Sequence, residues 1–133
     1  MYSFVLQDWV TIFGDAPTTT DIVQSEPDWL SFQAYQDIVF YTECKSFDTA
    51  GATGIQVVYE TSPTKDESLF KANPMATRFV DLSSVGVDPV ILATAAFPLA
   101  RWVRWRLHLN GVGAGAWHAT IRLNCAANAG RML

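Results

Sequence analysis

The chain has 133 residues, a mass of 14.7 kDa and a net charge of −4, and half of its residues are apolar. This length suits one domain of ordinary size, and the 13% aromatic content excludes a disordered chain. The acidic balance disfavours general nucleic-acid binding. No apolar run reaches the ~18 residues of a membrane span, and no basic segment at the start predicts a signal peptide.

Short apolar stretches alternate with turn residues along the whole chain, at a spacing typical of an all-β sandwich or barrel. We therefore predict a single-domain, antiparallel β-sandwich of jelly-roll type over residues 1–133. Its N-terminal strands or arm would cover 1–36, its core 37–125 and its C-terminal tail 126–133. The expected strands lie near residues 4–13, 28–35, 37–47, 54–61, 77–82, 89–97, 100–110 and 116–125.

Two of these stretches carry further expectations. The apolar residues of 4–13 could also line one face of a helix, but their β-branched and aromatic side chains favour a strand. We expect the segment from Tyr2 through Phe13 to reach a neighbouring subunit. Residues 90–97 are apolar throughout, which is typical of a strand that is buried on both faces.

The most regular alternation lies in two late stretches that are joined by the glycine-rich segment 110–115. Such a connection suits a hairpin, so the two stretches are predicted to pair antiparallel. In the first, Val103, Trp105, Leu107 and Leu109 would face the core; in the second, Trp117, Ala119, Ile121, Leu123 and Cys125 would. The opposite, exposed face of the hairpin would then gather Arg104, Arg106, His108, His118 and Arg122.

The sequence contains no recognisable catalytic set. Cys44 and Cys125 are read as buried thiols, because a disulfide scaffold would carry more cysteines. The two histidines would lie among arginines, which repel a metal ion. The acidic residues fall mostly on turns, where carboxylates are solvated or act as caps. We therefore expect no metal, no cofactor and no enzymatic activity.

The two halves of the chain carry opposite charge. Residues 1–67 hold 11 acidic and 2 basic residues, and residues 68–133 hold 2 acidic and 7 basic residues, so the halves carry −9 and +5. Opposed charges of this kind could join neighbouring copies. Strands of the two halves could equally interleave within one fold and mix the charges.

Several segments resemble small β-sandwich proteins that decorate the heads of tailed bacteriophages, also called cement proteins. Glu60-Thr61-Ser62 opens a T-S-x-x-x-D turn that ends at Asp66, and Phe70 follows. Arg101-Trp102-Val103-Arg104-Trp105 matches an R-[YW]-V-R-[WF] strand, and Ala119-Thr120-Ile121-Arg122-Leu123 matches the closing strand. The resemblance covers roughly residues 37–125. The R-[YW]-V-R strand is also similar to discoidin-like and carbohydrate-binding sandwiches.

This resemblance implies a structural virion protein, made in the host cytoplasm, that binds the major capsid protein and other copies of itself on the capsid exterior as a homotrimer. No nucleic-acid or membrane partner is expected. The alternative is a carbohydrate-binding module of a tail or adhesin protein, whose exposed aromatic rings would stack on sugar. The predicted interface residues are Trp9, Asp28, Trp102, Arg104, Arg106, His108, His118 and Arg122.

Overall fold

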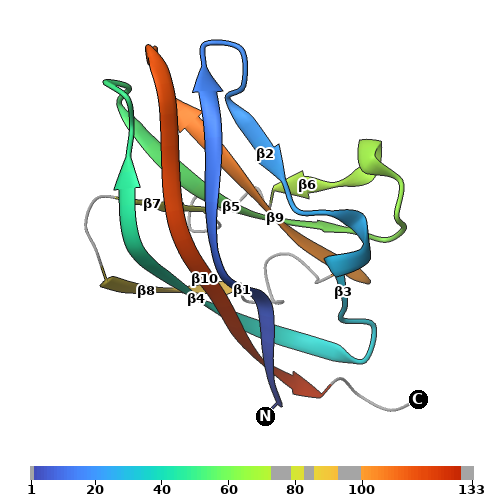
Figure 1. The fold of residues 1–133 in the computed structure, drawn as a ribbon. Coiled ribbons are helices and arrows are strands. Elements are labelled where there is room, and N and C mark those ends of the chain that lie inside the picture. Colours follow the sequence, from blue (N-terminus) through green and yellow to red (C-terminus); the bar gives the residue numbers. More distant parts are fainter. Residues whose placement is uncertain (1, 73–78, 83–85, 93–99, 130–133) are drawn as a thin grey trace.

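Alternating apolar side chains give each long strand one face that must be buried, and two such sheets bury their faces against each other. In the computed structural model, which describes residues 2–72, 79–82, 86–92 and 100–129, the chain forms a β-sandwich of two antiparallel sheets (Figure 1). Sheet A has the strand order β1 (Tyr2–Ala16), β10 (Gly115–Ala129), β4 (Tyr35–Asp48) and β8 (Gly86–Leu92).

Sheet B is built on two nine-residue strands, β9 (Trp102–Asn110) and β5 (Gly54–Ser62), which pair along their whole length. Short strands flank them: β2 (Asp21–Val23) and β3 (Leu30–Ser31) pair with β9, and β6 (Lys71–Ala72) and β7 (Phe79–Asp81) pair with β5. Two 3-10 helices lie between these strands: η1 (Glu26–Asp28) connects β2 to β3, and η2 (Glu67–Leu69) connects β5 to β6.

The predicted hairpin of the two late strands is wrong. β9 lies in sheet B beside β5, and β10 lies in sheet A between β1 and β4, so the chain crosses from one sheet to the other. Gly111 and Gly115 have φ of 83° and 102°, which only glycine adopts easily, and Gly113 packs against Ala16 and Leu109. A glycine-rich link permits both a hairpin and a crossing between sheets. The strands with which β9 and β10 pair decide between the two.

Other predicted strands are confirmed or corrected as follows. The expected strands at 4–13, 37–47, 54–61, 100–110 and 116–125 are confirmed as β1, β4, β5, β9 and β10. Of the expected strand at 28–35, only Leu30–Ser31 form a separate strand, β3, because η1 ends at Asp28 and β4 begins at Tyr35. The described part of the expected strand at 77–82 forms β7. β8 lies beside β4 at one end of the sheet A order, and the predicted burial of residues 90–97 on both faces concerns side chains outside the described residues. Residues 77–78 and 93–97 of the remaining predicted strands lie outside the described residues.

The sandwich also extends beyond the predicted core range of 37–125. β1 pairs with β10 from Tyr2 to Ala16, so the N-terminal segment is part of sheet A. Ala126 to Ala129, assigned to a tail, continue β10. Leu6 and Phe32 are buried in the core.

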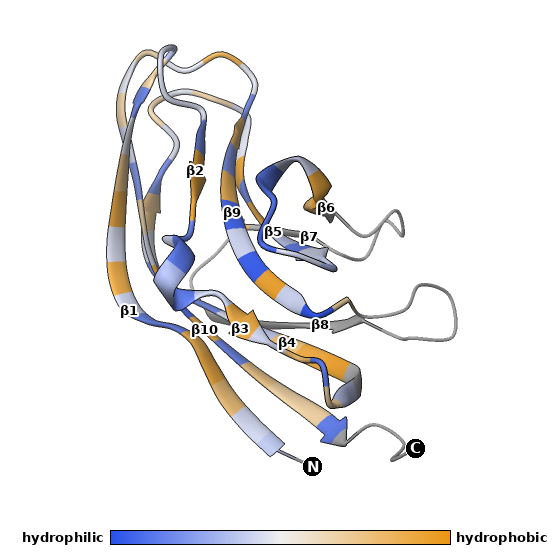
Figure 2. Cartoon of the chain, turned by 90° about the vertical axis from the view of Figure 1, so that its right-hand side faces the viewer, coloured by the Kyte–Doolittle hydropathy of each residue, from blue (hydrophilic) through white to orange (hydrophobic). Residues whose placement is uncertain are grey.

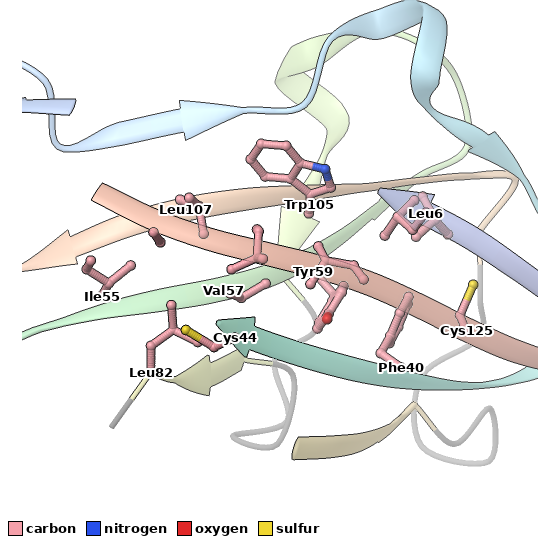
Figure 3. Close-up of a cluster of buried hydrophobic side chains, with 14 of the residues drawn as sticks. Leu6, Phe40, Cys44, Ile55, Val57, Tyr59, Leu82, Trp105, Leu107 and Cys125 are labelled. Atoms are coloured by element: carbon pink, nitrogen blue, oxygen red, sulfur yellow. The ribbon is translucent and has the colours of Figure 1, made fainter. Parts of the chain in front are cut away.

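The core lies between the two sheets, and both alternating sets predicted for it are confirmed as buried. Figure 3 shows Phe40 of β4 and Tyr59 of β5 side by side, and their rings stack at 3.9 Å between centroids. The Tyr59 hydroxyl shares a 2.6 Å hydrogen bond with Thr42. Cys44 and Cys125 are buried thiols, as expected, and burial raises the pKa of Cys125 to about 12.

One buried polar side chain, Gln24, connects the two sheets. Its Nε2 donates to the carbonyl oxygen of Leu6 in β1 at 2.7 Å and to that of Asp28 in η1 at 3.1 Å. Its Oε1 accepts from the backbone N–H of Trp105 in β9 at 3.3 Å. Its own carbonyl oxygen accepts from the indole of Trp29 at 2.8 Å. Gln24 is only 3% exposed. If its side chain were removed, its partners would lose their hydrogen bonds and water could not replace them.

Gln24→Ala is expected to lower the free energy of unfolding by about 2–3 kcal/mol, because it leaves buried carbonyl and N–H groups without partners. Urea denaturation would measure the loss. Gln33, an exposed glutamine, is the matched control, and Gln33→Ala should change stability by less than about 0.5 kcal/mol. Equal stabilities of the two variants would contradict the role assigned to Gln24.

Gly14→Ala is expected to destabilise the fold by about 1–3 kcal/mol, because its Cβ would overlap the indole of Trp117 opposite it on β10. That indole cannot move aside, since it is fully buried and donates to the carbonyl oxygen of Thr19 at 2.9 Å. Gly54→Ala is the control, since no atom lies within 4 Å of its added Cβ. Thermal unfolding of both variants measures the difference.

Candidate functional site

The strand register of sheet A arranges one continuous outer face. Residues of β10 that alternate with its core residues point outward, and their partners on β1 and β4 point the same way. Three rows of residues cross this face, each read from β1 through β10 to β4: Val5–Asn124–Tyr41, Thr11–Thr120–Ser46 and Phe13–His118–Asp48.

An ion pair lies at the centre of this face. The Arg122 guanidinium binds the Glu43 carboxylate in two places, at 2.5 Å and 2.9 Å, and Asn124 donates to the same carboxylate at 2.6 Å. The hydrogen bonds from Arg122 lower the pKa of Glu43 against partial burial, which acts to raise it. Arg122 and Lys45 also lie over the ring of Trp9, at 5.0 Å and 5.9 Å from its centroid.

Exposed apolar side chains lie on both sides of the ion pair along this face. Val5, Trp9, Phe13 and Tyr41 are 55%, 43%, 68% and 40% exposed. Val5 and Tyr41 border an open groove of about 320 Å³. Large rings and aliphatic groups beside a paired charge are features of protein contact surfaces. We call this set of four residues, with Arg122 and Glu43, the sheet A patch.

The five residues expected to share one face lie on two. His118 and Arg122 are on β10 in sheet A, whereas Arg104, Arg106 and His108 are on β9 in sheet B. The prediction of a single arginine and histidine face is therefore wrong. The reason is the crossing between β9 and β10, which separates the alternations of the two strands onto opposite sides of the sandwich.

On sheet B the charged residues neutralise one another. Glu60 of β5 accepts from Arg104 Nε at 3.0 Å and from Arg106 Nε at 3.3 Å. Asp21 of β2 pairs closely with Arg106 and lies 2.8 Å from His108 Nδ1. Burial acts to raise the pKa of Asp21, but the hydrogen bonds with His108 and Arg106 outweigh it, so this pKa is lowered.

Arg104 is not exposed, contrary to the alternation. Its side chain is 4% exposed and lies against the rings of Phe70 and Trp29, at 4.0 Å and 5.1 Å from their centroids. Glu67 of η2 is 3.7 Å from one of its terminal nitrogens. The segments around η1 and η2 cover this part of sheet B. Arg104 therefore contacts these segments and does not reach solvent.

The remaining predicted residues are dispersed. Trp9 is exposed on β1, and Asp28 is exposed in η1. Trp102 is half-buried on β9, with Lys65 and Arg101 over its ring at 4.5 Å and 5.2 Å. Trp29 is buried.

The predicted interface residues did not include Val5, Phe13, Tyr41 or Glu43, although Val5 and Phe13 lie in the segment that was expected to reach a neighbouring subunit. The alternation of Trp9, Thr11 and Phe13 was readable, because these residues share one face of a strand. The positions of Val5 and Tyr41 on this face could not be predicted from the sequence, because β1 has register shifts between Val5 and Val10. Only the pairing of three strands shows that the two residues lie in one row.

The opposite charges of the two halves meet within the chain. Arg104 and Arg106 pair with Glu60 and Asp21, and Arg122 pairs with Glu43. The second of the two interpretations of the charge asymmetry, mixing within one fold, therefore holds for these arginines.

Comparison with protein-family models, with curated proteins and with solved structures found no match to this chain. Among the described residues, no group of three or more His, Cys, Asp or Glu side chains could hold a metal ion. Within the same residues no helix has the length and apolar character needed to cross a membrane.

Glu43→Gln is expected to flatten the acid dependence of stability. Because the folded-state pKa of Glu43 is lowered, its contribution is present above the ordinary pKa of 4.5 and is lost as pH falls through the folded value. At neutral pH the variant should be less stable than wild type by under ~1 kcal/mol, since the pair is partly exposed. The gap should close on acidification.

Urea denaturation at several pH values from about 7 down to about 3 measures this gap. Glu26→Gln serves as the control, because no described residue forms an ion pair with its exposed side chain. A constant difference between wild type and Glu43→Gln at all pH values would contradict the assignment.

Proposed function

We propose that this chain is a structural protein that decorates and stabilises the capsid of a tailed phage through protein–protein contacts, with the sheet A patch as its contact surface. The observation that carries the proposal is the exposure of Val5, Trp9, Phe13 and Tyr41 on one face around the Arg122–Glu43 pair. Apolar anchors beside satisfied charges lose little on desolvation and exclude water from a contact.

We also assign the sandwich to the jelly-roll type. The support is the strand order: β1-β10-β4-β8 in one sheet, and β2-β9-β5 in the other with β7 next to β5. Eight strands in this arrangement are two intertwined Greek keys, an architecture found in viral capsid proteins and in lectins. The fold is therefore compatible with both capsid decoration and carbohydrate binding, and the surface residues are needed to distinguish the two functions.

The mechanism would be mechanical. Each copy would place its sheet A patch on the major capsid protein at the capsid exterior, and many weak contacts around the lattice would add through multivalency. Because the copies would bind the assembled shell and not its separated subunits, binding would stabilise the shell by mass action.

The two partly exposed tryptophans favour a protein partner over a sugar. A sugar stacks on an open ring face, but Trp9 has Arg122 and Lys45 over its ring, and Trp102 has Lys65 and Arg101. Cations over aromatic rings and exposed apolar neighbours are the composition of a protein interface. Carbohydrate binding is the second candidate because Phe13 and Tyr41 also expose rings on this face.

The test is cosedimentation of the purified chain with heads of the phage that encodes it. Val5→Ser combined with Tyr41→Ser should reduce binding at least tenfold, because both side chains leave the contact. The matched control replaces Leu69 and Val112 by Ser, which are exposed apolar residues elsewhere at 44% and 88%. Undiminished binding by the first variant would refute the assigned surface, and specific binding to a glycan array would favour the sugar alternative.

A further inference from the structure

We infer that the chain pairs with a second copy of itself through the free edge of β1, so that two sheets A join into one continuous sheet across a two-fold axis. This inference does not depend on the proposed function. It concerns the backbone edge from Trp9 to Phe13, whereas the proposed capsid contact is tested at Val5 and Tyr41.

β1 is an edge strand, and among the described residues the backbone groups on its free side have hydrogen-bond partners only near its two ends. It pairs with β10 on one side, and Figure 2 shows it running along the margin of the molecule. The Leu6 carbonyl oxygen accepts from Gln24 at 2.7 Å, and the Asp15 carbonyl oxygen accepts from the Thr19 N–H at 2.8 Å. Between them, no backbone hydrogen bond from another described segment outside sheet A reaches Val10 to Gly14.

The register shifts of β1 end at Val10, and the open part of the edge that follows them lacks the features that prevent strand pairing. Natural edge strands are protected by charge, proline, bulges or short length. The sequence from Trp9 to Gly14 has no charge and no proline, and it is rich in β-branched and aromatic residues. The other edge strand of sheet A, β8, contains Asp88 and Pro89. The end strands of the sheet B order, β2 and β6, have only three and two residues.

The same segment is complementary to itself. In an antiparallel pair centred on Thr11, Trp9 lies opposite Phe13 of the second copy, and Val10 lies opposite Ile12. Trp9 and Phe13 are exposed on the outer face, so the two-fold axis forms two aromatic cross-strand pairs. Val10 and Ile12 pack against the core and continue it across the junction.

Charge does not oppose this register. Asp8 would lie opposite Gly14, and Asp15 opposite Gln7, so no two carboxylates would be directly opposed. A contact between identical segments closes after two copies and does not propagate. The expected assembly is therefore a dimer, in place of the trimer that the phage resemblance implies.

The first experiment is size-exclusion chromatography with light scattering. Wild type should have twice the 14.7 kDa chain mass. Thr11→Lys and Thr11→Asp should each weaken the dimer at least tenfold, because like charges meet at the axis. An equimolar mixture of the two variants should restore the dimer, which a misfolded chain could not do. Ser46→Lys is the control, since it adds the same charge to the outer face on β4, two strands from the edge.

A monomeric or trimeric wild type over a roughly hundredfold concentration range would overturn the inference, as would a dimer that survives Thr11→Lys. The inference would also be overturned if Ser46→Lys, but neither Thr11 variant, abolished the dimer. The two copies would then contact each other through the outer face of sheet A and not through the edge of β1. Hydrogen exchange on wild type needs no variant. Of the amides from Val10 to Phe13, those that point away from β10 should become more protected as protein concentration rises, and concentration-independent exchange of these amides would contradict the pairing.

Discussion

The buried amide of Gln24 is the interaction on which the arrangement of the two sheets depends. It binds the Leu6 carbonyl oxygen in β1, the Trp105 N–H in β9 and the Asp28 carbonyl oxygen in η1. A buried amide is stable only when these groups are all in place, so it sets the position of one sheet relative to the other. It also closes the edge of β1 at one end and leaves the following residues open.

The two outer faces of the sandwich differ because the loops are distributed unequally. Segments around η1 and η2 fold over sheet B, where Trp29 and Phe70 enclose Arg104 and where Glu60 neutralises two arginines. No described segment covers the sheet A patch in this way, and Phe13 is its most exposed member. The charges of sheet B therefore serve stability, and the apolar groups of sheet A are available to a partner.

The strand order determines how the charges of the two halves of the chain are paired. The acidic first half and the basic second half supply opposite members of the ion pairs Arg104–Glu60, Arg106–Asp21 and Arg122–Glu43. Interleaving the halves in both sheets brings these groups within hydrogen-bonding distance. Arginines that looked like interface anchors are thus bound inside the chain, and their capacity to attract a second molecule is reduced.

The sandwich, its five long strands and the core faces of β9 and β10 follow from the sequence, because a two-residue alternation depends only on local geometry. The placement of β9 and β10 in different sheets depends on long-range pairing and could not be read from the sequence, since a glycine-rich link allows both a hairpin and a crossing. The tertiary structure also decided that Arg104 is buried, because distant loops cover it. The position of Val5 and Tyr41 in one row also depends on long-range pairing. Alternation along a strand does not encode which residues of other strands lie beside it or cover it.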